Sequence, residues 1–255
     1  MTLSYIPSDT NDEGVLKATA SGILPNGKPV IVNADGTVSA VAETTVTQAV
    51  GTPVTFRSAL CTYIAAAYDS ANNKVVIAYR DGGNSGYGTA VVGTTNASNN
   101  SISFGTPVVF ESADTQRIAT TYDVNAGKVL VSFQADGGNS GRLTSIVGTV
   151  SNTSISFGSA VVINTSTYAT HVASVYDANA QKVVLVATTA GAPAAFVCTI
   201  SGTSVSSGTR VVFGGTSGEQ NRITYDANAQ KVVVICNYSS AGRARVGTVS
   251  GTSIS

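Results

Sequence analysis

Residues 225–234 read Tyr-Asp-Ala-Asn-Ala-Gln-Lys-Val-Val-Val, and close variants of this phrase begin at three other tyrosines, Tyr68, Tyr122 and Tyr176. Successive tyrosines are separated by 54, 54 and 49 residues. A regular period of roughly 20–50 residues is typical of solenoids, propellers and related repeat architectures. The sequence therefore predicts a chain built from four similar structural units.

Each copy of the phrase has the pattern of a β-hairpin. An apolar run ends at Tyr-Asp, a few turn-forming residues follow, and a lysine opens a β-branched run. Asp and Asn suit the turn, because their short side chains bond to nearby backbone amides and tolerate a left-handed φ. We therefore expect the repeated aspartates to have a structural role and not a catalytic one.

The predicted fold class is all-β, with a β-propeller-like array of four-stranded repeats and a small N-terminal β-hairpin leader. Each repeat starts with a glycine and a short apolar run, contains the Tyr-Asp hairpin, and ends in further strands; four strands is the number in a propeller blade. The repeats run approximately over residues 50–104, 105–157, 158–207 and 208–255.

The strand before each Tyr-Asp pair is apolar on both faces. Ile64 and Ile118 lie on one face, and Ala65 and Ala119 lie on the other. Such a sheet must be covered on both faces, as adjacent blades would do. A β-solenoid is the rival architecture, but its repeats are shorter and its strands parallel, whereas tight hairpins are evident here. A four-bladed ring could close if residues 51–56 completed the last blade; the alternative is a natural protein that continues beyond Ser255 with further repeats.

Residues 1–48 lack the repeat and form a separate leader before the array at 49–255. Residues 29–41 read Pro-Val-Ile-Val-Asn-Ala-Asp-Gly-Thr-Val-Ser-Ala-Val, which indicates one or two small hairpins. An isolated two-stranded hairpin is only marginally stable. We therefore expect the leader to dock on the repeats, on a neighbouring copy of the chain or on another protein.

The composition of the 255 residues excludes several classes of partner. Only 11% of residues are charged, and 14 basic side chains balance 14 acidic ones, so no long-range field would attract nucleic acid. We expect no membrane span and no export signal, because no apolar run is long enough and the N-terminus lacks a basic and an apolar region. The three scattered cysteines are expected to be buried free thiols.

Two groups of residues are candidates for ligand binding. The loop Asp-Gly-Gly-Asn-Ser-Gly occurs at 81–86 and 136–141, and its oxygen ligands could contact carbohydrate or Ca²⁺. One carboxylate per loop is poor for Ca²⁺, so we expect no metal, and a wide Gly-rich turn is the alternative interpretation. The second group is the polar position five residues before each repeated tyrosine, where ligands could meet at one end of the strands. The candidates are Asp81, Asn84, Asp136 and Asn139 from the loops, and Tyr63, Arg117, His171 and Gln220 from the strands.

No catalytic residue or cofactor is expected. The lone histidine, His171, has no evident nucleophile beside it in the sequence, and Walker, Rossmann and His-Glu-x-x-His motifs are absent. Hydrolysis of a glycan would instead need two nearby carboxylates from different repeats. The available candidates are Asp81, Asp136, Glu111, Asp114 and Glu219.

Several phrases resemble repeat regions of virion fibre and appendage proteins of tailed bacteriophages. They are Tyr-Asp-x-Asn-x-x-Lys-Val-Val, Asp-Gly-Gly-Asn-Ser-Gly, the Ser-Ile-Ser-Phe-Gly-Thr-Pro-Val-Val-Phe run at 101–110, and the leader segment at 29–41. The resemblance covers nearly the whole chain and implies a non-enzymatic virion protein that binds a host-surface glycan or protein. Its leader would then contact other virion proteins or copies of itself. The alternatives are a glycan-active propeller enzyme and a bacterial surface adhesin.

Overall fold

The computed structural model describes residues 18–41, 50–137, 140–165, 168–215, 219–238 and 240–255. The chain divides into two compact units, Met1–Ala49 and Val50–Ser255. Every regular element in the described ranges is a β-strand, so the all-β prediction is confirmed. None of these residues forms a helix with the length and hydropathy needed to cross a membrane.

The first unit contains a single described hairpin. Strand β1 (Val30–Val32) pairs antiparallel with β2 (Val38–Ala40). In the turn between them, Asp35 accepts hydrogen bonds from the hydroxyl and the backbone N–H of Thr37, at 2.7 and 2.9 Å. Both hydrogen bonds lower the pKa of Asp35, and the one from the hydroxyl has the larger effect. All three residues of β1 are exposed, and the docking role of the leader stays a prediction.

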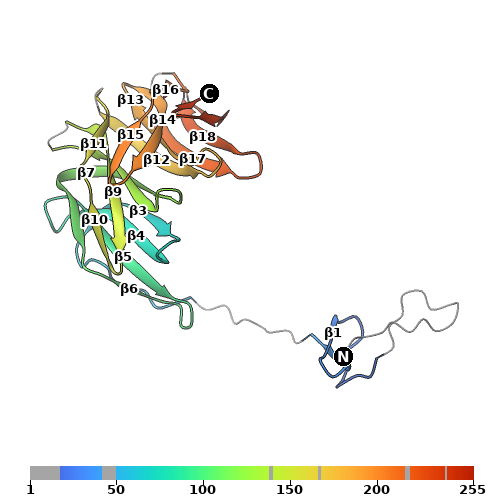
Figure 1. The fold of residues 1–255 in the computed structure, drawn as a ribbon. Helices are drawn as coiled ribbons and strands as arrows, with labels where there is room; N and C mark the ends of the chain where they lie inside the picture. Colours follow the sequence, from blue (N-terminus) through green and yellow to red (C-terminus); the bar gives the residue numbers. More distant parts are fainter. Residues whose placement is uncertain (1–17, 42–49, 138–139, 166–167, 216–218, 239) are drawn as a thin grey trace. The chain divides into compact units, whose positions relative to one another are not determined.

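The second unit consists of antiparallel strands in four successive repeats (Figure 1). Repeat 1 contains β3 (Cys61–Asp69), β4 (Lys74–Asp81), β5 (Tyr87–Asn96) and β6 (Ser101–Phe104). Repeat 2 contains β7 (Val108–Asp123), β8 (Lys128–Ala135), β9 (Arg142–Ser151) and β10 (Ser154–Phe157). Repeat 3 contains β11 (Val161–Asn164), β12 (Ala169–Asp177), β13 (Lys182–Thr189), β14 (Ala192–Ser201) and β15 (Ser204–Ser207). Repeat 4 contains β16 (Val211–Val212), β17 (Glu219–Asp226), β18 (Lys231–Tyr238), β19 (Ala241–Gly247), β20 (Val249–Ser250) and β21 (Ser253–Ile254).

The outer edge of each of the first three repeats differs from the predicted four-stranded blade. The third long strand pairs with two short partners, one from its own repeat and one that opens the next repeat. Thus β5 pairs with β6 and with the start of β7, while β9 pairs with β10 and β11, and β14 with β15 and β16. Each of these three repeats therefore has three long strands and a divided outer position.

Strand β7 joins the first two repeats into one nine-stranded sheet, where the sequence predicted separate sheets. Its first part pairs with β5, and its second part, from Thr115, pairs with β8. Neither glycine nor proline interrupts the segment between Glu111 and Gln116. The strand can therefore run on from the outer edge of one repeat to the first long strand of the next.

The first long strands of the repeats, β3, β7, β12 and β17, are neighbours in this order. An apolar cluster fills each of the three junctions between consecutive repeats. Ile118 of β7 is accordingly buried. Ile64, at the corresponding position of β3, is 54% exposed. In the second unit taken by itself, no neighbouring repeat covers the outward face of repeat 1.

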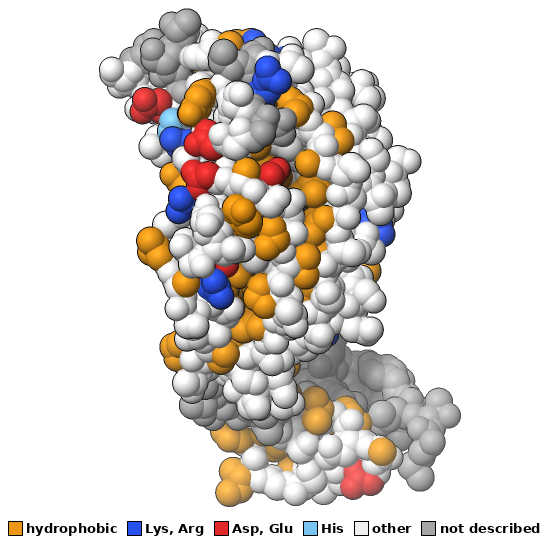
Figure 2. All heavy atoms as spheres, turned by 90° about the vertical axis from the view of Figure 1, so that its left-hand side faces the viewer, with side chains coloured by type: hydrophobic (Ala, Val, Ile, Leu, Met, Phe, Trp, Pro, Cys, Tyr) orange, Lys and Arg blue, Asp and Glu red, His pale blue; other side chains and the backbone are white. Residues whose placement is uncertain are grey.

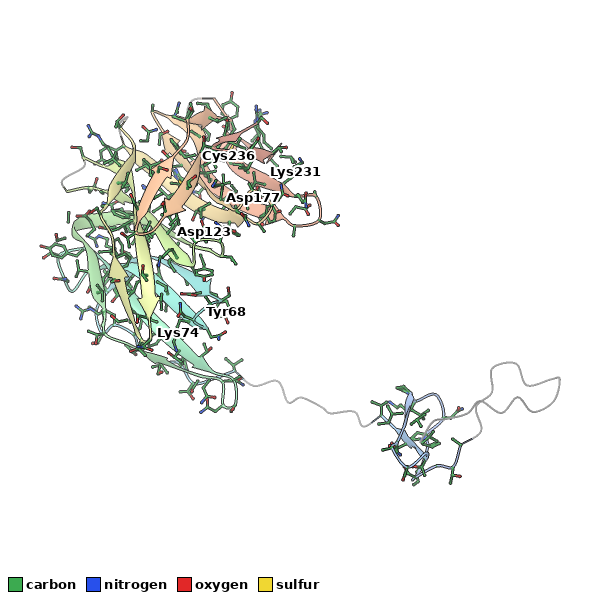
Figure 3. All side chains as sticks on the ribbon, viewed as in Figure 1. Tyr68, Lys74, Asp123, Asp177, Lys231 and Cys236 are labelled. Carbon is green, nitrogen blue, oxygen red and sulfur yellow. The ribbon has the colours of Figure 1, made fainter. Side chains whose placement is uncertain are left out.

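The Tyr-Asp turns are held by their aspartates. Oδ1 of Asp69, Asp123, Asp177 and Asp226 accepts hydrogen bonds from backbone amides two or three residues later. In Figure 3 the labelled turn residues Tyr68, Asp123, Asp177 and Lys231 lie along one side of the repeat unit. The geometry of these turns explains the repeated aspartates without any catalytic role.

Candidate functional site

A β-bulge interrupts the first long strand of every repeat, near the end opposite to the Tyr-Asp turn. The pairing register shifts there, and the bulged residue has a positive φ. The four residues are Tyr63 (φ 50°), Arg117 (52°), His171 (53°) and Gln220 (56°). A left-handed backbone at a non-glycine residue costs on the order of 1 kcal/mol or more, and such strain clusters at functional sites. The candidates taken from this sequence position therefore share a special conformation.

The first glycine-rich loop lies at the same end of repeat 1. Asp81 pairs with Cys61, the first residue of β3, so the loop at 81–86 begins beside the start of that strand. Asp81 is 4% exposed, and its Oδ1 accepts hydrogen bonds from Nε of Arg57 and the backbone N–H of Gly83, both at 3.0 Å. These contacts give Asp81 a structural role in the turn. Asn84 donates its backbone N–H to the carbonyl of Asp81 at 3.0 Å.

The corresponding loop of repeat 2 contributes Asp136, while Asn139 lies outside the described residues. Gln116 joins Asp136 to Asp114, because its Nε2 donates to Oδ2 of both carboxylates, at 2.7 and 3.0 Å respectively. The two carboxylate oxygens are therefore no farther apart than the sum of these distances. Two of the five candidate carboxylates thus lie within the roughly 10 Å of each other that glycoside hydrolysis requires.

Arginine and glutamine side chains extend this network on both sides. Nε of Arg80 donates to Oδ1 of Asp114 at 2.6 Å, and both side chains remain partly exposed. Gln134 donates from Nε2 to Oδ1 of Asp136 at 3.0 Å and accepts from Nε of Arg117 at 3.1 Å. The result is a continuous row of planar donors and acceptors across repeats 1 and 2. Its members apart from the two aspartates follow no motif, except that Gln116 adjoins the bulged Arg117.

An open cavity of about 480 Å³ lies next to this network. It is lined by Thr62, Tyr63, Arg80 and Gln116. The ring of Tyr63 is partly exposed, and its hydroxyl donates to Oε1 of Gln116 at 3.4 Å. The cavity thus combines an exposed aromatic ring with charged and amide groups on its wall.

Charged side chains at the bulges of repeats 2 and 4 interact with His171, the bulged residue of repeat 3. Burial is the main cause that lowers the pKa of His171; the charges of Arg117 and Arg222 lower it further, and Glu219 opposes them. Nδ1 of His171 lies 3.0 Å from the hydroxyl of Thr170. Gln220 occupies the equivalent bulge of β17. His171 is thus near the bulges on both sides of it, but no described hydrogen bond links it to the Asp114–Asp136 network.

Two further titratable groups adjoin the network. The charge of Asp136, and then a hydrogen bond to it, raise the pKa of Tyr168, which is exposed. Burial raises the pKa of Glu111, which lies three residues before Asp114 on β7. Within the described ranges no group of three or more His, Cys, Asp or Glu side chains is placed to hold a metal ion.

Figure 2 shows one face of the surface, on which most acidic and several basic side chains gather in one region, while the rest is largely uncharged. A separate cavity of about 330 Å³ is lined by residues of all four first long strands, among them Ala65, Ile118, Val172 and Ile223. The four strands therefore line one open hollow.

Comparison with known proteins supports the fold and gives no family. No family model matches the chain, and no curated protein matches its sequence. Among solved structures, it is similar to a crystal structure of an exo-beta-1,3-galactanase from Phanerochaete chrysosporium with beta-1,3-galactotriose, with a TM-score of 0.55 and 10% identity. The match covers 81% of this chain and 51% of that one, so this chain spans about half the length of the galactanase chain.

Proposed function

We propose that the repeat unit is a glycan-binding domain whose ligand lies in the cavity beside Tyr63. The observation that carries this proposal is the combination of that exposed ring with the Arg80–Asp114–Gln116–Asp136 row. A tyrosine offers a flat apolar face to the C–H side of a sugar ring. Carboxylate, amide and guanidinium groups accept from and donate to its hydroxyls.

We also infer that the four repeats are blades of a propeller. The shared space between β3, β7, β12 and β17 and the apolar cluster at each junction support this arrangement. In such an array the bulged ends of the inner strands face one end of the central space, where ligands bind readily. The ligand would therefore contact residues from more than one repeat.

Binding to oligosaccharides tests the proposal, with beta-1,3-galactotriose as the first probe because the similar structure carries it, followed by a glycan array. Tyr63→Ala should weaken binding of the best ligand by about tenfold or more, as truncation of a central aromatic contact does. Val124→Ala is the control, because Val124 is 59% exposed in the turn after β7, away from the bulged ends of the strands. Equal loss in both variants, or no binding to any glycan, would contradict the proposal.

Hydrolysis is the second candidate function, and the bridged pair Asp114 and Asp136 favours it. Their separation suits an acid and a nucleophile or base. However, each of the four carboxylate oxygens already accepts one hydrogen bond from Arg80, Gln116 or Gln134. The two groups are thus held as hydrogen-bond acceptors, and each oxygen keeps a lone pair that can accept from a sugar hydroxyl. We therefore expect binding without cleavage. Release of reducing sugar from galactotriose by the wild type, lost in Asp114→Asn and Asp136→Asn, would establish the enzyme instead.

The role in a virion is proposed from the sequence resemblance to phage fibre and appendage proteins. The protein would then act outside the cell after release, with its ligand on a host surface and residues 1–48 docked to another virion protein. Immunogold labelling of particles tests this location. Labelled tails or fibres would support it, and unlabelled particles from cells that produce the protein would contradict it.

A further inference from the structure

The two ends of the repeat array expose complementary halves of a contact that the chain makes three times internally. From this we propose that copies of the chain associate head to tail, with repeat 4 of one copy packed on repeat 1 of the next. Three separate features of the junctions support the proposal.

The first feature is a strand pairing. At each internal junction, an apolar pair that opens one repeat adds to the third long strand of the repeat before it. Val108 pairs with Ala90, Val161 with Ser145, and Val211 with Ala195. In a contact between copies with the same register, Val54 of one copy would pair with Ala244 of the other, and Thr55 would pair with Arg243. Neither segment makes this pairing within the described chain. Residues 51–56 form no strand, and β19 pairs only with β18 among the described strands.

The second feature is a tyrosine that rests on the aspartate turn of the preceding repeat. Burial, and then the charge and hydrogen bonding of Asp69, raise the pKa of Tyr122. The backbone N–H of Asn179 likewise donates to the hydroxyl of Tyr225 at 3.2 Å. Within the second unit no described Tyr-Asp turn precedes Tyr68 of repeat 1. Tyr68 is 54% exposed, and its hydroxyl donates to Asn73 of its own turn at 2.8 Å.

The turn of repeat 4 provides the missing partner for Tyr68. Asp226 accepts the same two backbone hydrogen bonds as Asp177, at 3.0 and 2.9 Å, yet it is exposed whereas Asp177 is 1% exposed. A second copy placed by the internal geometry would bring its Tyr68 onto this turn.

The third feature is apolar surface on both end faces. Ile64 of repeat 1 and Ile235 and Val246 of repeat 4 are 54%, 45% and 66% exposed. Their counterparts at the internal junctions, such as Ile118 and Val186, are buried. Removal of this surface from water would drive association. Because the two faces differ, the contact is heterologous and repeats until a ring closes or a helical filament forms.

The first test is the mass of the purified full chain in solution, by light scattering and sedimentation over a range of concentrations. We expect dimers or larger species whose dissociation constant rises about tenfold or more in Val246→Asp. Val124→Asp is the matched control, since Val124 is 59% exposed in a turn away from both end faces. A monomeric wild type would overturn the proposal. Assembly that survives Val246→Asp would also overturn it and assign association to another surface, such as the leader.

The second test identifies the register and remains informative if a variant folds poorly. Cys236 lies directly opposite Arg243 on β18 of the same chain and would compete for a new thiol there. In a Cys61→Ser, Cys236→Ser background, Thr55→Cys on one chain and Arg243→Cys on another should form a disulfide when the two proteins are mixed, because directly opposed strand residues have Cα atoms about 4.5–5.5 Å apart. A disulfide only within the double variant, in a protein of monomer mass, would show that the chain closes on itself. That result, or no disulfide, contradicts the proposal.

Discussion

Replacement of Asp177 by alanine should destabilise the fold far more than the same change at Asp226. The two carboxylates make the same pair of hydrogen bonds to backbone amides, at 3.0 and 2.9 Å. They differ in burial, because Asp177 is 1% exposed and Asp226 is exposed. The comparison therefore isolates the effect of solvent on the repeated turn.

The magnitude follows from what replaces the carboxylate. Beside Asp177 the amides of Asn179 and Ala180 would lose a charged acceptor in a buried position, and a buried donor left unsatisfied costs about 1–3 kcal/mol. Part of this cost is recovered through the contact of Asn179 with Tyr225. We expect the free energy of unfolding to fall by about 2–4 kcal/mol in Asp177→Ala. Water can replace the carboxylate at Asp226, so Asp226→Ala should cost about 1 kcal/mol or less.

Urea unfolding of the full chain, followed by circular dichroism at a concentration at which light scattering shows a monomer, measures both values with the Asp226 turn uncovered. Asp177→Asn serves as the control, because it keeps an acceptor oxygen and should lose less stability than the alanine variant. Equal losses for Asp177→Ala and Asp226→Ala would refute the argument, since burial would then not decide the strength of the turn.

Three further predictions address other parts of the molecule. The hydroxyl of Tyr79 is buried without a described hydrogen-bond partner. Tyr79→Phe should therefore raise the free energy of unfolding by about 1 kcal/mol in the same assay. Phe133→Tyr, at the equivalent position of repeat 2, should lower it. The pKa of His171 in the folded chain lies below its usual value of 6.5. Between the folded and unfolded pKa values the unfolded chain binds more protons, so the stability of the fold rises with pH. The melting temperature should therefore fall as the pH is lowered through 6.5, and this fall should be shallower in His171→Gln. All three apolar clusters lie within the second unit, so removal of residues 1–49 should leave its melting temperature unchanged, and a large drop would show that the leader is part of that fold.

The repeated phrase was sufficient to predict the β class, the hairpins and the structural role of the aspartates, because each of these depends on local turn chemistry and strand patterning. It could not predict the divided outer edge of each repeat. Whether the run after Gly105 bends or continues into β7 depends on pairing with β5, which is distant in the sequence from the end of β7. The open faces at Ile64 and Ile235 were missed for a related reason, since local patterning does not show how many neighbours a repeat has.

The candidate site was predictable in part. The variable position before each Tyr-Asp pair drew attention to Tyr63 and Arg117, which the structure places at equivalent bulges. The repeated glycine-rich loop separately suggested a ligand-binding role for Asp81, and in the structure its Oδ1 accepts hydrogen bonds from Arg57 and Gly83. Gln116 carried no sequence signal, because its importance comes only from the two carboxylates that the folded repeats bring to it.

The most direct test of the proposed function is a co-crystal structure of the chain with the oligosaccharide that gives the highest signal on the glycan array. The account predicts a sugar ring stacked on Tyr63, with hydroxyls bonded to Arg80 and to the carboxylates of Asp114 or Asp136. An oligosaccharide bound at the Tyr-Asp turns, on the leader or on the outer edges of the repeats would contradict it.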